Sequence, residues 1–277
     1  NISFPGGLSF SPGLTGGVLI VALVLSMAAG DLNAWVALIG FAGGVATGSF
    51  FLKKGFSLGR AYEAKPVGGA VLLVLLAALL VIGVATGAYA VSTEGPGSKH
   101  APIILSLVVA LIIGALAQKS RMCFAGSIRD IILMKNFDLI SIIAALFAVM
   151  AVYNAATGSF HLGFSGQPIA HSQHLWNILG MYVVGFAAVL AGGCPLRQLI
   201  LAGQGSSDSA VTFLGMLIGA AFAHNFGLVG VSAKAATETE PAVAGGPAAA
   251  GKIAVIVCIV VLFVIAGTNL RRKKTAK

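Results

Sequence analysis

Long apolar stretches, separated by short polar connections, make up most of this chain. A membrane-spanning helix needs about 20 apolar residues, and these stretches approach or exceed that length. Charged residues are 9% of the 277-residue chain, whereas a soluble domain has about 25%, so the charge needed to cover a water-facing surface is missing. The pattern predicts an all-α integral membrane protein and excludes a soluble globular domain.

We expect seven to eight hydrophobic helices and a single transmembrane domain over residues 1–277, with no room for a sizeable soluble domain. The apolar stretches cover residues 14–30, 34–52, 67–92, 102–117, 139–158, 177–192, 209–231 and 252–269. The first stretch is bracketed by glycines and is shorter than a full span, so we expect a half-helix there.

Basic residues indicate the orientation, because short loops rich in Lys and Arg stay on the cytoplasmic side. They gather after the second stretch (Lys53, Lys54, Arg60, Lys65), after the fourth (Lys119, Arg121, Arg129, Lys135) and in the tail (Arg271, Arg272, Lys273, Lys274). Alternating helices place all three groups on one side. We therefore predict a multi-pass protein of the cell inner (plasma) membrane with a cytoplasmic C-terminus. Topology and anion handling explain the net charge of +9, so no nucleic-acid partner is expected.

An internal repeat relates two parts of the chain at an offset of 71 residues, the separation of Cys123 and Cys194. In each copy a helix precedes the cysteine, and a segment too short to cross the bilayer follows it, over 124–130 and 195–205. Repeats with short helices are the usual sequence indication of a transport site. The repeat units are expected at about 102–158 and 177–231.

The sharpest local motif is Gly192-Gly193-Cys194-Pro195. Two glycines let the chain leave a helix, and proline is favoured at the first position of a new one. Cys194 is thus predicted at a helix N-cap, where unpaired N–H groups attract anions, and Arg197 adds a positive charge one turn on. The motif favours binding of an anion, or contact of the Cys194 thiol with a sulfur-bearing anion. The alternative is that it only breaks the helix and that the buried cysteine is inert.

The other cysteines differ from each other in their surroundings. Cys123 has the cationic neighbours Arg121 and Arg129, which raise the thiolate fraction but which topology alone would also explain. Asp130 is expected to pair with Arg129 or Arg121. Cys258 lies in a continuous apolar helix and is expected to be a small packing residue. Three sparse cysteines do not predict a disulfide framework.

Histidines occur in two further motifs. His224-Asn225 lies inside the seventh apolar stretch, and intramembrane polar residues usually face a bundle interior or a water path; a hydrogen bond between helices is the alternative. His171 and His174 lie in an external loop with no cysteine or carboxylate nearby. Neither a metal nor another cofactor is predicted.

These motifs resemble the YeeE/YedE family of membrane transporters of sulfur compounds. The resemblance is carried by residues 121–130 and 190–205, and, toward a selenium-metabolism YedE-like branch, by 53–60, 192–203 and 223–228. It covers about residues 30–270. It implies an hourglass fold in which short, re-entrant helices enter from both faces and meet at a narrow centre, where cysteines line the path of thiosulfate or a related species.

The resemblance implies a transporter, and not an enzyme, that passes a small sulfur- or selenium-containing anion along cysteines at short-helix N-termini. The anion and membrane lipid are the expected partners. The expected substrate path comprises Cys194, Cys123, Gly192, Gly193, Pro195, Arg197, Gln198, Arg121, Arg129, His224 and Asn225.

Family members generally carry a preceding half, of which residues 18–53 are expected to be a remnant. Residues 28–34 match its last motif, but Val18, Leu19 and Ile20 stand where Gly-Cys-Pro is expected. We therefore expect a fragment, a degenerate member, or one half of an assembly with a second membrane half or further copies of itself.

Two other functions stay open. The first is a non-transporting membrane anchor for a larger complex or for a small soluble sulfur-carrier protein on the cytoplasmic side. The second is an enzyme that forms a persulfide on Cys194. No general base is evident beside this cysteine in the sequence, which argues against an enzyme unless His224 folds near it.

Overall fold

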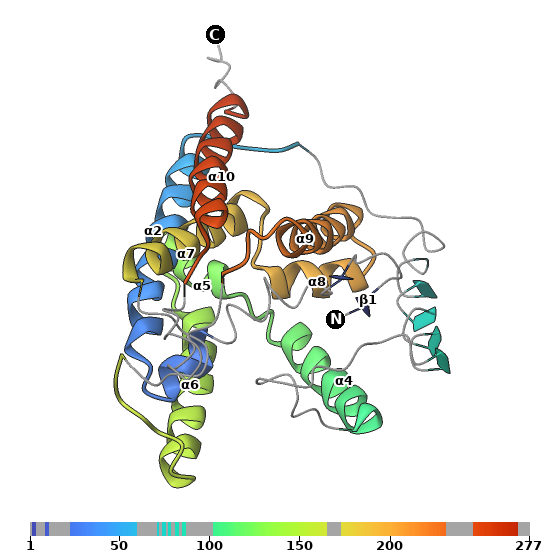
Figure 1. Cartoon of the computed structure of the whole chain (residues 1–277). Helices are drawn as coiled ribbons and strands as arrows, with labels where there is room; N and C mark the ends of the chain where they lie inside the picture. Colours follow the sequence, from blue (N-terminus) through green and yellow to red (C-terminus); the bar gives the residue numbers. More distant parts are fainter. Residues whose placement is uncertain are drawn as a thin grey trace, which may run out of the picture. The chain divides into compact units, whose positions relative to one another are not determined.

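The computed structural model describes residues 2–3, 9–10, 23–59, 71, 74–75, 77–78, 81–82, 85–86, 102–164, 173–230 and 246–270. Regular structure in these residues is helical apart from two short strands, β1 (Ile2–Ser3) and β2 (Ser9–Phe10), which pair antiparallel. The prediction of an all-α architecture is confirmed (Figure 1).

The helices fall where the apolar stretches predict them. They are α2 (Leu32–Lys53), α4 (Ile103–Lys119), α5 (Phe124–Met134), α6 (Asp138–Ala156), α7 (His174–Leu190), α8 (Pro195–Gly203), α9 (Ser207–Asn225) and α10 (Ala249–Thr268). Residues 23–28 are also helical, as are the described positions between 71 and 86. The short segments predicted after Cys123 and Cys194 are α5 and α8.

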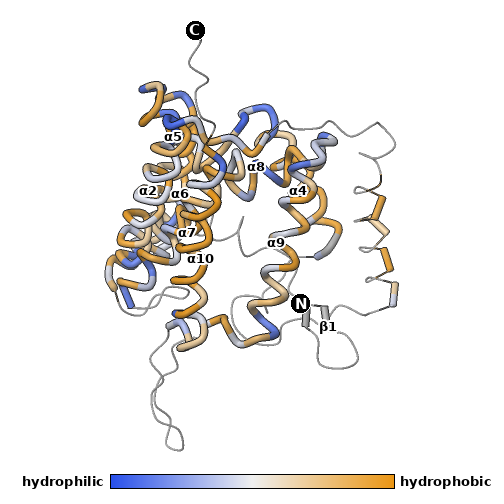
Figure 2. The backbone as a smooth tube through the Cα atoms, turned by 90° about the horizontal axis from the view of Figure 1, so that it is seen from above, coloured by the Kyte–Doolittle hydropathy of each residue, from blue (hydrophilic) through white to orange (hydrophobic). Residues whose placement is uncertain are grey.

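Five helical segments of the described residues are long and apolar enough to cross a membrane. They are Leu32–Lys53, Ile104–Met134, Asp138–Ala156, His174–Gly203 and Ala249–Thr268. Figure 2 shows hydrophobic residues along most of α10, and several of its large side chains, such as Ile253 and Val260, are exposed. Exposed apolar side chains on such helices are suited to contact with lipid, so the chain is a multi-pass membrane protein.

Several predictions concern residues outside those that the structure describes. They include the half-helix positions Val18, Leu19 and Ile20, the external His171, and the cations Arg60, Lys65 and 271–274. The orientation of the chain, which depends on those cations, stays a prediction.

The described elements gather in two compact groups, which are treated separately below. One group contains β1, β2, α4, α8 and α9, and within it α8 contacts α4 and α9. The other contains residues 23–59 with α2, followed by α5, α6, α7 and α10. The predicted single domain with repeat units stays a prediction.

Helices α2 and α7 pack unusually closely in the second group. A β-carbon added at Gly40 or Gly44 would collide with the backbone of α7, and one at Gly185 would collide with the backbone of α2. Glycines at this spacing let membrane helices approach each other at backbone distance. The Tyr182 hydroxyl donates a hydrogen bond to Thr47 Oγ1 at 3.0 Å, which adds a polar contact between the same helices.

Helix α10 lies beside α2 and α7 (Figure 1), and aromatic rings of the three helices contact one another. Phe186 of α7 is fully buried, and its ring centre lies 5.8 Å from that of Phe51 and 5.2 Å from that of Phe263. The backbone also pairs Phe56 with Leu270 in an isolated antiparallel bridge. These contacts hold the C-terminal end of α7, and so the turn that follows it, against two neighbouring helices.

Candidate functional site

Both repeated cysteines lie at the start of a short helix. Cys123 is the N-cap of α5, and its Sγ accepts a hydrogen bond from the Gly126 N–H at 3.2 Å. Cys194 immediately precedes Pro195, the first residue of α8, as the motif predicts. The turn before Cys194 contains Gly192 with φ of +83°, a left-handed conformation that a residue with a β-carbon adopts at a cost.

The two cysteines are in direct contact. The Cys194 N–H donates a hydrogen bond to Cys123 Sγ at 3.4 Å, and the two side chains are hydrogen-bonded as well. Cys123 is 6% exposed and Cys194 is fully buried, and neither forms a disulfide. The fold therefore brings together two cysteines that are 71 residues apart, a contact that the sequence did not predict.

Helix α5 is held by contacts with α2, α6 and α7, which bury its first residues. Its Ser127 hydroxyl donates to the Phe124 carbonyl at 2.7 Å. At the next turn Arg129 forms an ion pair with Asp130, with 2.8 Å between Nη2 and Oδ1. The expected pairing of Asp130 is thus with Arg129, and that guanidinium is not an unopposed cation for an anion.

In the other compact group, Arg197 lies one turn into α8. Its Nη1 donates to Gln118 Oε1 of α4 at 3.4 Å, so the partner of this cation is a neutral amide. Gln118 was not singled out from the sequence, although it is a polar residue at the end of an apolar stretch. Gln198 beside Arg197 is buried, whereas Arg121 is exposed and has φ of +54° where α4 ends.

His224 and Asn225 lie at the C-terminal end of α9 in that same group. His224 is exposed, and the Asn225 side-chain amide donates to the Ala221 carbonyl of its own helix at 2.8 Å. His174 packs its ring against Phe164, and Cys258 is exposed on α10. Among the described residues, no three His, Cys, Asp or Glu side chains gather where they could hold a metal ion.

A local pattern occurs three times among the described residues: a helical segment ends, a left-handed residue follows, and a polar side chain then accepts a backbone N–H at the start of a long helix. The left-handed residues are Gly30, Lys135 and Gly205. The side chains that accept a backbone N–H at the following helix are Asp31 before α2, Asn136 before α6 and Ser206 before α9. Residues 23–53 therefore have the same order of local features as the segments that follow Cys123 and Cys194.

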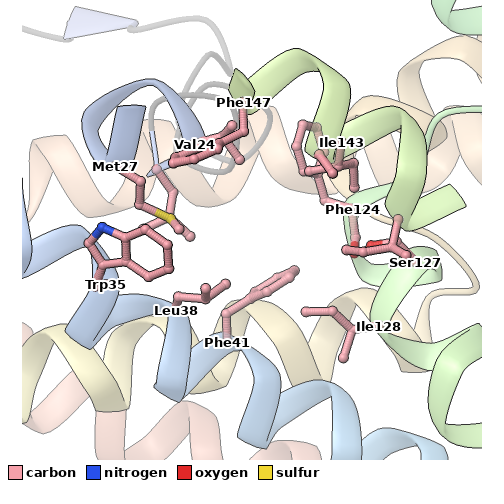
Figure 3. Close-up of a pocket in the computed structure, with 13 residues that line it drawn as sticks. Val24, Met27, Trp35, Leu38, Phe41, Phe124, Ser127, Ile128, Ile143 and Phe147 are labelled. Carbon is pink, nitrogen blue, oxygen red and sulfur yellow. The ribbon is translucent and has the colours of Figure 1, made fainter. Parts of the chain in front are cut away.

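A cavity of about 190 Å³ lies between residues 23–27, α2, α5 and α6 (Figure 3). Trp35 and Phe41 of α2, Phe124 of α5 and Phe147 of α6 line it, and Ser127 is the polar residue among its lining side chains. An apolar cavity of this kind would strip water from an anion without replacing its hydrogen bonds. The cysteine contact, rather than this cavity, has groups suited to a sulfur-bearing anion.

Comparison with known sequences gives matches in one functional class. The family described as Sulphur transport matches residues 119–277, which include both contacting cysteines. The thiosulfate transporter TsuA of Spirochaeta thermophila is 30% identical over 115 residues, which cover 40% of this chain and 33% of that protein. The thiosulfate transporter TsuA of Escherichia coli is 26% identical over 121 residues, covering 42% and 32%.

A third relative matches a shorter segment. An uncharacterized transporter of Bacteroides fragilis is 92% identical over 26 residues, 9% of this chain and 5% of that protein. The chain thus matches about a third or less of the length of each of these relatives. No solved structure matches it.

Proposed function

The chain belongs to the Sulphur transport family, and from this membership we propose that it forms part of a membrane path for a small sulfur-containing anion. The observation that carries the proposal is the contact of Cys194 with Cys123, each at the start of a short helix. Helix N-termini present unpaired N–H groups and favour negative charge. Thiols beside them add weak donors that match a sulfur ligand.

Thiosulfate is the proposed substrate, since two relatives are named thiosulfate transporters. Its terminal sulfur would replace one cysteine as the hydrogen-bond partner of the other, so that it sits between the two thiols. Weak contacts suit transport, because a ligand that binds too tightly does not leave. Selenium analogues with the same charge and a larger terminal atom are proposed as alternative substrates.

The polar groups of the path have distinct proposed roles. Gly192 and Gly193 shape the turn before Cys194, and Pro195 starts the short helix. Arg197 is the cation proposed to hold the anion, because its partner is the neutral Gln118. Arg129 contributes less, since Asp130 offsets its charge. Arg121, Gln198, His224 and Asn225 are proposed to line the remaining path.

We further propose that the path is completed in an assembly, with a second membrane half or further copies of this chain. The three occurrences of a left-handed residue followed by a side chain that binds the start of a long helix support a repeat architecture in which residues 18–53 are the counterpart of the two cysteine-bearing units. An inner-membrane location with a cytoplasmic C-terminus, and a soluble sulfur-carrier protein on the cytoplasmic side, belong to the same proposal.

Uptake of labelled thiosulfate into vesicles that contain the protein tests this function. Cys194→Ala is expected to abolish most uptake, whereas Cys258→Ala, which changes the exposed cysteine of α10, is expected to leave it unchanged. Equal uptake by the Cys194→Ala and unmodified proteins would exclude the cysteine role. Absence of uptake by the unmodified protein, together with a co-purifying soluble partner, would favour a membrane anchor instead.

A further inference from the structure

The contact between Cys123 and Cys194 brings together two thiols that approach from different segments of the chain. Cys123 begins α5, and Cys194 ends the turn after α7. Their side chains are hydrogen-bonded, and the Cys194 N–H lies 3.4 Å from Cys123 Sγ. A pair of reduced thiols in contact has a chemistry that neither thiol has alone, because one can complete a substitution that the other begins.

Cys194 lies at the end of a glycine-containing turn between α7 and α8. Residues 191–194 are non-helical, and Gly192 adopts a left-handed conformation with open space where a β-carbon would be. Ala191 and Gly192 are exposed, so the turn that carries Cys194 lies at the surface of the chain. A disulfide needs a sulfur–sulfur distance of about 2.05 Å, so its formation requires this turn to move toward the start of α5.

We propose that Cys123 and Cys194 form a reactive dithiol for sulfur oxyanions that contain a central S–S bond, of the tetrathionate class. Such an anion is two thiosulfates joined through sulfur. The dithiol reduces it to two thiosulfate anions and is itself oxidised to a disulfide. The chemistry depends on the thiol contact, and its effect on transport rests on the proposed function.

The reaction balances in two substitutions. One cysteine sulfur attacks a central sulfur of tetrathionate, the central S–S bond breaks, and the first thiosulfate leaves with the bonding electron pair while the thiol proton passes to water. The attacking cysteine then carries an S–SO₃⁻ group. The second cysteine attacks the first cysteine's sulfur, displaces the second thiosulfate and releases the second proton. Two thiols are oxidised by two electrons, and one tetrathionate is reduced by two.

The disulfide product would inactivate the proposed site. A Cys123–Cys194 disulfide would remove both thiol donors from the proposed path and tie the start of α5 to the turn after α7. Reduction by a dithiol such as dithiothreitol would restore both donors. A chain exposed to the oxidised form of its proposed substrate would therefore stop transporting until it is reduced.

Treatment of the purified full chain with tetrathionate tests the proposal. In Cys258→Ser, whose remaining thiols are Cys123 and Cys194, we expect two thiosulfate anions released per chain, loss of both thiols, and a cross-linked peptide pair that dithiothreitol separates. The unmodified chain should give the same cross-linked pair, and an adduct on its exposed Cys258 is counted separately. Cys194→Ser in the Cys258→Ser background should release one thiosulfate and keep the S–SO₃⁻ group on Cys123.

Three results would overturn the proposal. The first is that folded Cys258→Ser chains keep both thiols, whereas the same chains in denaturant lose them. The second is that an adduct accumulates on Cys123 or Cys194 of Cys258→Ser without a disulfide. The third is that disulfides form between chains. Uptake is measured separately on treated vesicles. If the disulfide forms and thiosulfate uptake is unchanged, the dithiol chemistry stands and the proposed transport role of the cysteines fails.

Discussion

The backbone N–H of Cys194 points at the sulfur of Cys123 across a distance of 3.4 Å, although 71 residues separate the two cysteines. Each residue lies where a long helix has ended and a short one begins. Helix α5 packs against α7, and α7 packs against α2 through glycines, so three helices fix the positions of the two thiols. The predictions below test these supports and the charges near them.

The glycine contact between α2 and α7 predicts different effects at two neighbouring positions. In Gly44→Ala the new β-carbon meets the Tyr182 carbonyl and the Phe186 nitrogen, so the helices must separate, at a cost of about 1–3 kcal/mol. In Gly43→Ala it meets Tyr182 Cδ2 at 3.7 Å, an ordinary contact. Thermal unfolding in detergent should show a lower Tm for Gly44→Ala alone. Equal Tm values would contradict the close packing.

The hydroxyl contact between the same helices predicts a smaller effect. Tyr182→Phe removes the hydrogen bond to Thr47 and keeps the ring, and interhelical hydrogen bonds in membrane proteins contribute about 0.6 kcal/mol on average. The free energy of unfolding should fall by about that amount, and Thr47→Val in the Tyr182→Phe background should add little through this bond. Additive losses from the two substitutions would show that the bond is absent.

The ion pair on α5 predicts that Arg129 stabilises the helix more than it attracts substrate. Arg129→Gln leaves the buried Asp130 carboxylate without its cation and should cost about 1–2 kcal/mol, since the pair is partly exposed. Asp130→Asn in the same chain should restore much of that loss. Unfolding in denaturant measures both. A double variant as unstable as Arg129→Gln would assign the loss to another contact of Arg129.

The contact of Arg197 with Gln118 predicts an effect on substrate affinity. Arg197→Gln removes a cation whose partner is neutral, and a hydrogen bond to a charged group is worth about 1.5–3 kcal/mol. The KM for thiosulfate uptake should rise roughly tenfold or more, with vesicle content of the protein unchanged. Gln118→Leu should raise the KM less, because the charge remains. An unchanged KM in Arg197→Gln would remove this residue from the path.

The cap of α2 predicts a stability effect away from the cysteines. Asp31 is buried, and its carboxylate accepts the Asn33 N–H at 2.8 Å. Asp31→Ala should lower the free energy of unfolding by about 1 kcal/mol, and Asp31→Ser should restore part of it, since serine also caps helices well. Thiosulfate uptake per folded chain should not change. If Asp31→Ser is as unstable as Asp31→Ala, the carboxylate has a role other than capping.

Much of the helix layout could be predicted from the sequence, because hydrophobic length and helix-breaking residues act locally. The stretch 139–158 became α6 at Asp138–Ala156, and the Gly-Gly-Cys-Pro motif correctly predicted that a short helix starts at Pro195. Similar local signals predicted that a short helix follows Cys123 as well as Cys194, and α5 and α8 begin there. These helix-start signals depend on a few neighbouring residues, so they can be recognised without knowing the tertiary contacts.

The partners of these residues could not be predicted in the same way. Asp130 had two candidate cations in sequence, and the fold pairs it with Arg129, its neighbour on α5. Gln118 became the partner of Arg197 although 79 residues separate them. Such pairings depend on which helix faces meet, and helices with apolar residues on every side carry little sequence information about their contacts.

The sequence by itself determined that this chain consists of apolar helices and that short helices begin at two cysteines. The tertiary structure alone decided that the cysteines touch. Hydrophobic length sets how many helices cross a membrane, whereas backbone-close packing at Gly40, Gly44 and Gly185 sets where α7 ends relative to α5. The thiol contact is a consequence of that packing, which repeat spacing cannot reveal.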